Sequence, residues 1–399
     1  MSWSALLLLL PHFKPKCINY LSPTLGLVID ACRIFSLLVA VALYVQAFLK
    51  EKKYPSLPTW LLGIMEGWIF LITIRNGGDF VQVCSLAVSI MALALIVDLY
   101  SHRMKELLIV LMFHYEWMVY ANLYTVWKWP DQGMVLDTEY NVPIYFFGPD
   151  NWFMYLCIPA ICVALIYLRT QWNGKWRWLA SIRTICLIFA AYACVYLQWP
   201  ATAVAAMAVL AVVLLIGFIP LLGYCVSFPM VLLSGIAANL AIVVFRVMET
   251  IPQISDFIQN VLKKDITLSG RTQLWDGFWP IIRENLITGI GIPKEGYVMH
   301  SQQYGIEVYD HMHNIIFDLL IQGGIPALLL FLLLLLLVGK ELTVYAKTPT
   351  AKIMTAAMAG LLVMCIPEVC RHSAIFLIFP LAYYVGNIEQ NCTENSETD

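Results

Sequence analysis

Apolar runs of about 20 residues follow one another along the whole chain, and they limit its fold more than any other feature. A helix of about 20 residues spans the hydrocarbon core of a bilayer, which is about 30 Å thick. The runs are too long, and alternate too little, for the strands of a membrane β-barrel. Only 13% of the 399 residues are charged, which is about half of the share in a soluble domain. We therefore predict an all-α polytopic membrane protein, and we exclude nucleic-acid-binding proteins, disulfide-rich secreted modules and soluble α/β enzymes.

Hydropathy predicts about twelve transmembrane helices. The first run, which contains SALLLLL, has no basic segment before it and no small-residue cleavage site. We therefore expect it to be a retained span rather than a signal peptide. The predicted spans are residues 3–21, 24–49, 58–75, 79–99, 104–125, 151–169, 178–197, 199–217, 220–246, 314–338, 352–369 and 373–388.

Basic residues in the short loops predict the orientation of these spans. They follow spans two, four, six and ten, which are all even-numbered, and basic loops stay in the cytoplasm. We therefore expect both termini to be cytoplasmic. The basic residues are Lys50, Lys52, Lys53, Arg103, Lys105, Arg169, Lys175, Arg177, Lys340, Lys347 and Lys352.

This topology divides the chain into four parts. The longest external loop lies between spans nine and ten, and its apolar positions predict short amphipathic helices. The last residues are acidic and polar, and we expect them to be disordered. The parts are residues 1–246 with spans one to nine and an external loop at 126–150, residues 247–313 as the large external loop, residues 314–388 with spans ten to twelve, and residues 389–399 as a cytoplasmic acidic tail.

Ionisable residues gather at the external ends of the spans, where the positive-inside rule disfavours basic groups. Four of them are arginines, and a guanidinium group binds phosphate oxygens in a planar bidentate fork. The set therefore indicates a site for an anionic ligand, although each arginine taken alone also fits an interfacial side chain paired with lipid headgroups. The arginines are Arg75, Arg246, Arg271 and Arg371, and the neighbouring polar residues are Asp79, Glu249, His311, His313, Glu368 and His372.

The large external loop ends at a histidine that begins a late span. His313 and Asn314 are expected at the water–lipid boundary, and a histidine, with an ordinary pKa of about 6.5, acts as a general base at neutral pH. Asn314 is a candidate for orienting a substrate hydroxyl, and Gly323 and Gly324 allow close helix packing. His311 and His313 also suggest a metal site, but on a helix their side chains point apart. We therefore expect no metal.

Two other sets of residues are interpreted as structural. Most of the eleven cysteines lie inside apolar runs and no CxxC pair occurs, so we expect small core residues such as Cys365 rather than disulfides or zinc ligands. Asp30 and Arg33 lie within span two at a spacing of three residues. We interpret them as a self-neutralised pair that aids folding.

Three motifs in the last third of the chain, together with the hydropathy layout, resemble the superfamily of O-antigen ligases and O-antigen polymerases. The motifs are SGR-xx-LW from residue 269, N-x(3)-G-x-G at 285–291 and HN-x(9)-G at 313–324. Two further segments resemble polymerase-like members of that superfamily. They are RNGGDF (75–80) and FFGPDNWF (146–153).

The resemblance implies an integral membrane glycosyltransferase of the GT-C type, with its large external loop ahead of the histidine helix. In the family, external arginines bind the pyrophosphate of a polyprenyl-pyrophosphate-linked glycan, and the histidine activates the acceptor hydroxyl without a metal or a cofactor. Carried over by motif, His313 is the base and Arg271 the loop arginine. The other assigned residues are Asn314 and Gly324 as supporting residues by motif, and, by topology, Arg75, Arg246 and Arg371 on the pyrophosphate with Glu368 and His372 as support.

We expect an inverting polymerase that joins lipid-linked repeat units into O-antigen or capsule at the bacterial inner membrane, with its active site on the periplasmic face. Its partners are then the lipid-linked donor and acceptor, membrane lipids, and flippase and chain-length regulator proteins. The alternative within the family is an O-antigen ligase, which transfers the glycan to a lipid A core, and Ala327 stands where ligases often carry a second glycine. Alternatives of other classes are a flippase or transporter of lipid-linked oligosaccharide, and a structural scaffold, which leaves the external arginines unexplained.

Overall fold

The computed structural model describes residues 2–138, 141–172, 174–220, 222–224, 226–261, 265–268, 270–301, 305–369 and 371–393. The first half of the described chain forms helices and one short β-hairpin. The elements are α1 (Trp3–Leu9), η1 (Leu10–Phe13), α2 (Ile18–Leu21), α3 (Pro23–Glu51), α4 (Leu57–Arg75), α5 (Phe80–Leu99), α6 (Met104–Lys128), β1 (Val135–Asp137), β2 (Val142–Ile144), η2 (Asp150–Trp152), α7 (Phe153–Thr170), α8 (Arg177–Gln198) and α9 (Ala201–Phe218).

The second half of the described chain adds a helical connection, a second hairpin and the last helices. The elements are η3 (Leu222–Tyr224), α10 (Phe228–Asn239), η4 (Leu240–Val244), α11 (Val247–Thr250), α12 (Pro252–Asp256), η5 (Phe257–Val261), α13 (Arg271–Glu284), β3 (Tyr297–Ser301), β4 (Gly305–Tyr309), α14 (Ile315–Val344), α15 (Pro349–Met364), α16 (Ser373–Phe376), α17 (Ile378–Tyr383) and α18 (Val385–Thr393). Both hairpins are antiparallel, with Val135 opposite Ile144 in the first and Tyr297 opposite Tyr309 in the second.

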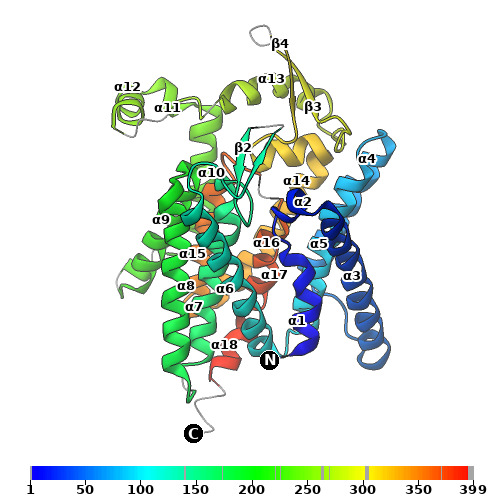
Figure 1. Ribbon diagram of the computed structural model, residues 1–399, viewed down its shortest axis with the longest axis vertical. Coiled ribbons are helices and arrows are strands. Elements are labelled where there is room, and N and C mark those ends of the chain that lie inside the picture. The colour runs from blue at the N-terminus through cyan, green and yellow to red at the C-terminus, as the bar shows by residue number, and fades with distance from the viewer. Residues whose placement is uncertain are drawn as a thin grey trace.

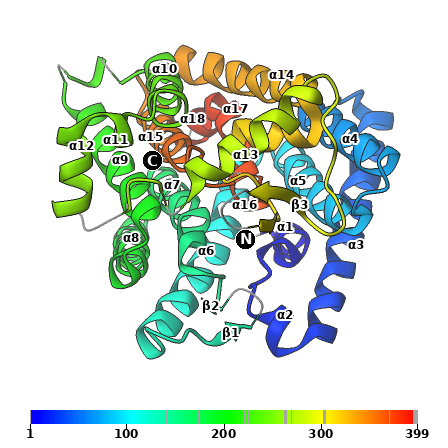
Figure 2. The same ribbon diagram turned by 90° about the horizontal axis from the view of Figure 1, so that it is seen from above.

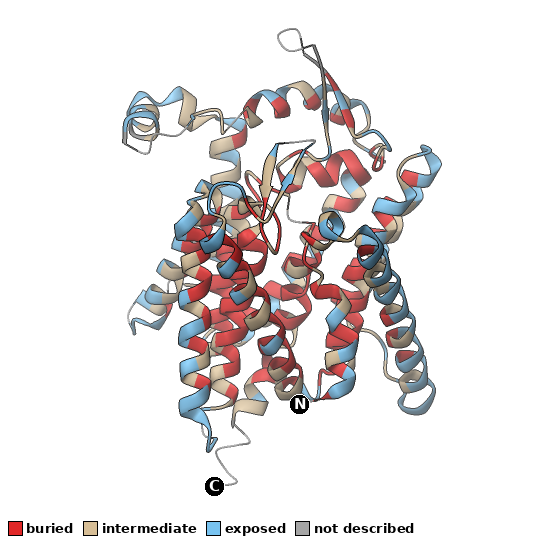
Figure 3. Cartoon of the chain, viewed as in Figure 1, coloured by how far each residue is buried: buried red, intermediate tan, exposed pale blue. Residues whose placement is uncertain are grey.

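The long helices form a body that carries polar elements at one end. The two hairpins and α11 to α13 lie at one end of this body, whereas α1 and α18 reach toward the opposite end (Figure 1). Seen from above, α3, α4, α14 and α8 lie at the periphery and α16 lies near the centre (Figure 2). Buried residues concentrate in the interior of the body, and the outer helices are largely exposed (Figure 3). Such exposed apolar helices require a lipid environment.

The helices agree with a polytopic membrane protein. Among the described residues, seven helices are long and apolar enough to cross a membrane. Shorter apolar helical segments occur at 3–13, 228–244, 349–364 and 373–383. The total of twelve spans and the GT-C assignment stay predictions. The seven helical segments are residues 23–51, 57–75, 80–99, 150–170, 177–198, 201–218 and 315–344.

The first predicted span, 3–21, is interrupted, as Pro11 and Lys14 in its sequence indicate. The chain leaves helical geometry at Lys14 and resumes it only at α2. Pro11 lies within η1, and Pro15 follows the break. A proline has no N–H to donate to the preceding turn, so two prolines four residues apart end the helix. The segment from Lys14 to Lys16, which follows the break, lines the large cavity.

The predicted tail was wrong at its beginning. Helix α18 continues through Thr393, so residues 389–393 are helical rather than disordered. Glu389 accepts from Arg169 Nη2 at 2.7 Å and from the Thr350 hydroxyl at 2.7 Å. These bonds hold the helix against α7 and α15. Residues 394–399 lie outside the described part of the chain.

Cys365 corrects the interpretation of the cysteines, because it is disulfide-bonded. It ends α15, and its carbonyl oxygen accepts from the backbone N–H of Ile315 at 3.1 Å. The covalent bond therefore lies where the beginning of α14 meets the end of α15.

Helix α14 is broken at Gly324, where the backbone has φ +63° and ψ −161°. This conformation is essentially restricted to glycine, and Pro326 follows it. The break leaves the carbonyl oxygens of Ile321 and Gln322 without helical donors. The N-x(3)-G-x-G segment supplies them: Ile290 N–H donates to Ile321 at 2.7 Å, and Gly291 N–H donates to Gln322 at 3.1 Å. The two glycine motifs of the sequence thus form one structure, in which a loop is hydrogen-bonded to a broken helix.

Candidate active site

A cavity of about 650 Å³ is lined by residues of α3, α5, α6, α7, α14 and α16 and of the segments between them. It follows α5 from Asp79, the N-cap, to beyond Ser89. Ten residues of helix correspond to about 15 Å, which is about half of the hydrocarbon thickness of a bilayer. The polar residues that line the cavity come from distant parts of the chain, and they include His12, Lys14, Arg33, His311, Arg371 and His372.

Beside this cavity, three of the predicted site residues contact one another. Arg271 Nη2 donates to Glu368 Oε1, and His313 Nδ1 lies 3.3 Å from Glu368 Oε2. The three residues come from the start of α13, the segment before α14 and the segment after α15. Glu368 is almost completely buried, with 3% of its side chain exposed. One carboxylate therefore joins the loop arginine and the predicted base.

The contact between His313 and Glu368 defines which ring nitrogen can act as a base. A carboxylate only accepts hydrogen bonds, so the imidazole proton lies on Nδ1 and the lone pair on Nε2. A carboxylate in this position holds the tautomer and stabilises the imidazolium that forms when Nε2 takes a proton. The contact with Glu368 thus fixes the orientation of the His313 ring.

The backbone at His313 is strained, with φ +48° in the left-handed region that non-glycine residues rarely adopt. The neighbouring residues hold this conformation. Asp318 Oδ1 accepts from the N–H of Met312 at 2.8 Å, and Trp275 Nε1 donates to the Met312 carbonyl at 2.8 Å. In this conformation, His313 Nδ1 contacts Glu368.

Asn314 has a different role from the one predicted for it. It is fully buried as the N-cap of α14, and its side-chain oxygen accepts from the N–H groups of Ile316 and Phe317 at 3.0 and 3.2 Å. Its Nδ2 donates to the carbonyl of Ile366 at 2.9 Å. The amide is therefore committed to the protein, and it fixes the residue before it rather than a substrate hydroxyl.

The protonation of the neighbouring groups follows from burial and charge. Burial, together with the neighbouring His313 and Arg271, lowers the pKa of His311 to about 3, although Glu368 acts in the opposite direction. Burial opposes ionisation of Glu368, but the hydrogen bond from His313 and the charge of Arg271 outweigh it, and the pKa of Glu368 lies below its usual value. Burial, reinforced by Arg33, lowers the pKa of His372 to about 4. At neutral pH the carboxylate is charged, and both His311 and His372 are neutral.

Arg371 lies on the wall of the cavity. Its Nη2 donates to Glu66 Oε2 at 2.7 Å, and both side chains are 2% exposed. Nε and Nη1 of Arg371 have no hydrogen-bond partner among the described residues, and the same holds for Gln322 Oε1 and His311 Nδ1. Buried polar groups are normally paired. These four unpartnered atoms around one cavity indicate that it suits a polar ligand.

His372 completes an aromatic part of the same wall. Its ring stacks on Tyr155 at a centroid distance of 5.2 Å and contacts Trp152 and Phe147 edge-on at 5.7 and 5.9 Å. Its Nδ1 accepts from the N–H of Ala374 at 3.2 Å as the N-cap of α16. The segment FFGPDNWF thus contributes two of its aromatic rings to the cavity.

Two of the predicted arginines lie away from the cavity. Arg75 is exposed at the end of α4. Arg246 is paired with Asp276 at 2.6 Å, lies 3.9 Å from Glu249, and donates to the Thr272 carbonyl at 3.0 Å. It joins the end of the α10 segment to α13, next to Arg271. Neither arginine lines the cavity.

The RNGGDF segment packs against the loop that contains the N-x(3)-G-x-G motif, residues 285–292, which we call the glycine loop. Asp79 N–H donates to the Ile292 carbonyl at 2.7 Å, and Asn76 Nδ2 donates to the Ile290 carbonyl at 3.0 Å. A Cβ atom on Gly78 would lie 2.2 Å from the Ile292 oxygen. The loop at 290–292 is therefore held between the break in α14 and the turn between α4 and α5.

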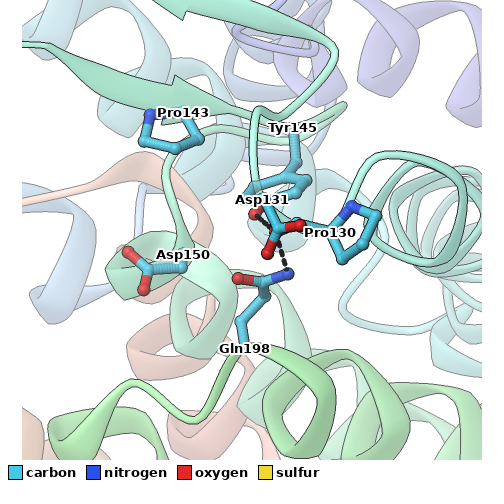
Figure 4. A pocket seen from close by; sticks show the side chains of 6 residues that line it. All are labelled: Pro130, Asp131, Pro143, Tyr145, Asp150 and Gln198. Atoms are coloured by element: carbon cyan, nitrogen blue, oxygen red, sulfur yellow. Dashed lines mark hydrogen bonds between the residues drawn. The ribbon is translucent and has the colours of Figure 1, made fainter.

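A second pocket, of about 250 Å³, lies beside the β1–β2 hairpin and the end of α8 (Figure 4). Gln198 Nε2 and the Tyr145 hydroxyl both donate to the Pro130 carbonyl, at 2.7 and 2.6 Å. Asp131 and Asp150 also line it. None of the predicted site residues belongs to this pocket.

Sequence reasoning missed the basic side of the large cavity. It includes Lys14, Lys16 and Arg33, and the pair of Asp30 with Arg33 was interpreted as structural. A signal was available in the sequence, because Lys14 and two prolines interrupt an otherwise apolar run. Across the described part of the chain, no three His, Cys, Asp or Glu side chains gather in a way that suits a metal ion.

Comparison with known families agrees with the motifs. Residues 185–332 match the sequence family described as O-antigen ligase. The matched segment runs from α8 into α14 and contains Arg246, Arg271, His313 and Gly324. No curated protein matches the chain. The match supports the superfamily of O-antigen ligases and polymerases for this chain.

Proposed function

Because residues 185–332 match the O-antigen ligase family, we propose that the chain is a glycosyltransferase of the bacterial inner membrane. It polymerises polyprenyl-pyrophosphate-linked oligosaccharide repeat units into a surface polysaccharide. The family supports action on lipid-linked glycans, and the apolar helices support a membrane location. The proposed chemistry rests on one observation, the contact that joins Arg271, Glu368 and His313.

His313 is the general base of this reaction. Nε2 takes the proton of an acceptor sugar hydroxyl while that oxygen forms a bond to the anomeric carbon of the donor. Glu368 holds the ring through Nδ1 and balances the positive charge that develops on it. An oriented base of this kind contributes about 10²–10⁴-fold to a rate.

The arginines stabilise the leaving group. The bond between the anomeric carbon and the pyrophosphate oxygen breaks, and its electron pair leaves with that oxygen. Arg271 lies beside the base, and Arg371 presents two unpartnered N–H groups to the cavity. Glu368 and Glu66 hold the two guanidinium groups in place. These groups therefore stabilise the negative charge on the leaving pyrophosphate without reorganising during the reaction. A single displacement of this kind inverts the anomeric centre.

The proposed topology follows from the same chemistry. Both termini are cytoplasmic, and α11 to α13 and the hairpins lie on the periplasmic side with the base. Residues 1–246 and 314–388 carry the membrane helices, residues 247–313 form the periplasmic cap, and the acidic tail is cytoplasmic. The polyprenyl chains extend among bilayer lipids. A flippase delivers the substrate to this face, and a chain-length regulator acts beside the polymerase.

Two alternatives predict different products. A ligase would transfer the glycan to a lipid A core, and a transporter would move the lipid-linked glycan without making a new bond. A transporter is expected to have repeat symmetry and charges near the bilayer midplane at a repeat interface. The oriented base beside the cavity favours an enzyme, and the aromatic contribution of FFGPDNWF favours the polymerase.

The experiment is transfer in detergent with purified protein and a synthetic lipid-pyrophosphate-linked repeat unit, with and without EDTA. We expect a ladder of products that EDTA does not abolish. His313→Ala and Arg271→Ala are expected to abolish the ladder while membrane insertion and abundance stay unchanged. Product formation only when a lipid A core is added indicates the ligase. Uptake into vesicles without any new product contradicts an enzymatic function.

A further inference from the structure

Three basic side chains gather on the N-terminal side of the cavity, and two of them pair with the same carboxylate. Lys14 Nζ donates to Asp30 Oδ2 at 2.7 Å, and Arg33 Nη1 donates to Asp30 Oδ1 at 3.1 Å. Two cations therefore share one carboxylate. Lys16 lines the same side, with its Nζ 5.4 Å from the Trp152 ring centroid. We call Lys14, Lys16 and Arg33 the N-terminal basic group.

The backbone fixes this group in place. Lys14 Nζ also donates to the Gly26 carbonyl at 3.0 Å, and Arg33 Nε donates to the Pro11 carbonyl at 2.9 Å. The backbone N–H of Lys16 donates to the Phe147 carbonyl at 3.2 Å. These bonds tie the broken first helix to α3 and to the segment that lies beside His372. Ionisable groups on a helix long enough to span a membrane are costly, and they usually mark a functional site.

Unpartnered polar atoms surround the space next to this group. His12 is 7% exposed, and its Nε2 lies 3.2 Å from the Ser36 hydroxyl, whereas its Nδ1 has no hydrogen-bond partner in the described structure. The hydroxyls of Ser89 and Tyr115 also lack partners there, and both residues are buried. All three residues line the cavity. Buried polar atoms without partners, in a cavity where two cations share one carboxylate, indicate an anionic and oxygen-rich ligand.

Three further carboxylates lie on this side: Asp79 and Asp310 line the cavity, and Asp137 and Asp310 act on Lys16. Asp79 Oδ1 accepts from the N–H of Gln82 at 2.9 Å, as the N-cap of α5. Asp310 belongs to the segment before His311 and lies near Lys16. Lys14 and Arg33 are therefore left with one carboxylate between them.

We propose that the N-terminal basic group binds the pyrophosphate of the acceptor, the second lipid-linked substrate. This inference rests on the proposed polymerase function, in which both substrates carry a pyrophosphate. One pyrophosphate leaves with the donor lipid, and Arg271 and Arg371 bind it and stabilise its charge. The other stays on the acceptor throughout, and it needs a separate group of cations within the same cavity. A ligase acceptor without a polyprenyl pyrophosphate would not need this group.

The test compares two acceptors that carry the same repeat unit. One acceptor has a short polyprenyl pyrophosphate anchor, and the other has a neutral alkyl anchor. The wild-type protein, the double variant Lys14→Gln/Arg33→Gln and the control Arg103→Gln are measured with each acceptor. Arg103 is an exposed arginine before α6 that pairs with Glu106 at 2.6 Å, and it does not line the cavity.

We expect the wild-type protein and Arg103→Gln to use the pyrophosphate acceptor with a KM about tenfold or more below that of the neutral acceptor. The double variant is expected to lose this preference while the KM for the donor stays unchanged. The conservative variant Arg33→Lys is expected to retain most of it. A second measurement needs no variant: at saturating donor, inorganic pyrophosphate raises the apparent KM of the pyrophosphate acceptor and leaves that of the neutral acceptor unchanged.

Three results would overturn the inference. In the first, the double variant impairs both acceptors equally, which indicates a structural role. In the second, the variant raises the KM of the donor, which assigns the group to the leaving pyrophosphate. In the third, inorganic pyrophosphate affects both acceptors alike. The absence of transfer to either acceptor by the wild-type protein is a different result, because it contradicts the proposed function itself.

Discussion

Replacing Gly324 by alanine is expected to separate the glycine loop from the broken helix. A Cβ atom at this position would lie 2.6 Å from the carbonyl carbon and oxygen of Ile287 and 2.6 Å from the oxygen of Leu286. These are backbone atoms, which cannot rotate away. The backbone conformation itself, at φ +63° and ψ −161°, is strained for alanine by about 1–3 kcal/mol.

Displacement of the backbone at Leu286 and Ile287 also removes hydrogen bonds between the loop and α14. Ile325 N–H donates to the Leu286 carbonyl at 2.7 Å, and Ile290 N–H donates to the Ile321 carbonyl at 2.7 Å. Each such bond contributes about 1 kcal/mol net. Together with the strain, we expect Gly324→Ala to lower the free energy of unfolding by about 3–5 kcal/mol. The loop at 290–292, which packs on the turn between α4 and α5, moves with it, and transfer activity falls.

The assay is thermal unfolding of the purified protein in detergent, with transfer activity measured in parallel. Gly67→Ala is the matched control, because no atom lies within 4 Å of a Cβ atom there and the residue lies inside α4. Alanine is favoured over glycine in a helix by about 1 kcal/mol, so the control should be as stable as the wild-type protein or more so. For Gly324→Ala we expect a Tm lower by roughly 5 °C. A Gly324→Ala protein with the Tm and activity of the control would refute the hydrogen-bonded loop at the helix break.

Three further predictions concern the charged groups. Glu368→Gln, which leaves an amide in place of the carboxylate beside His313, should lower kcat by about 10²–10⁴-fold with a small effect on KM; a kcat within a factor of three of wild type contradicts the orienting role. Arg371→Gln should lower the stability by about 3–5 kcal/mol, because it leaves Glu66 buried and unpaired, and the double variant with Glu66→Gln should recover part of the lost Tm; no recovery argues against the ion pair. Because the pKa of His311 is about 3 in the folded protein and about 6.5 when unfolded, only the unfolded chain takes up its proton between these values, so stability falls as the pH drops below 6.5, by up to about 2 kcal/mol at pH 5. His311→Gln should flatten this dependence in thermal unfolding between pH 7.5 and 5, and an unchanged slope would count against the buried neutral imidazole.

The sequence predicts most of the helical body, because span length and apolar composition are local properties. It is least exact at the first span, where Pro11 and Lys14 indicate an interruption but hydropathy still gives one segment, 3–21. It also misses the division of the last predicted span into α16, α17 and α18. In both places a few residues redirect the backbone although the mean hydropathy stays high.

The site is only partly predictable for a different reason. The motifs locate Arg271 and His313, but the partner that joins them, Glu368, lies 55 residues after His313 in the chain. Arg75 and Arg371 have the same chemistry and the same expected membrane face, yet one is exposed at a helix end and the other lies in the cavity. No local pattern separates such arginines, because tertiary packing decides which of them faces the cavity. The capping role of Asn314 was accessible from sequence, since asparagine directly before an apolar helix is a typical N-cap.

The same limit applies to the N-terminal basic group. Lys14 and Arg33 contact one carboxylate only because the chain turns back between η1 and α3. The spacing of Asp30 and Arg33 on one helix correctly predicts their pairing. The spacing does not predict that Lys14 also pairs with Asp30.

The central claim is that His313, oriented by Glu368, removes a proton from the acceptor hydroxyl. The most direct measurement is the single-turnover rate of glycan transfer at pH 7 by His313→Gln, with His102→Gln, an exposed histidine in the loop before α6, as the control. We expect His313→Gln to be slower than the wild-type protein by about 100-fold or more, and His102→Gln to be unchanged, with both variants equally stable and monodisperse. A His313→Gln rate within a few-fold of wild type would contradict the account.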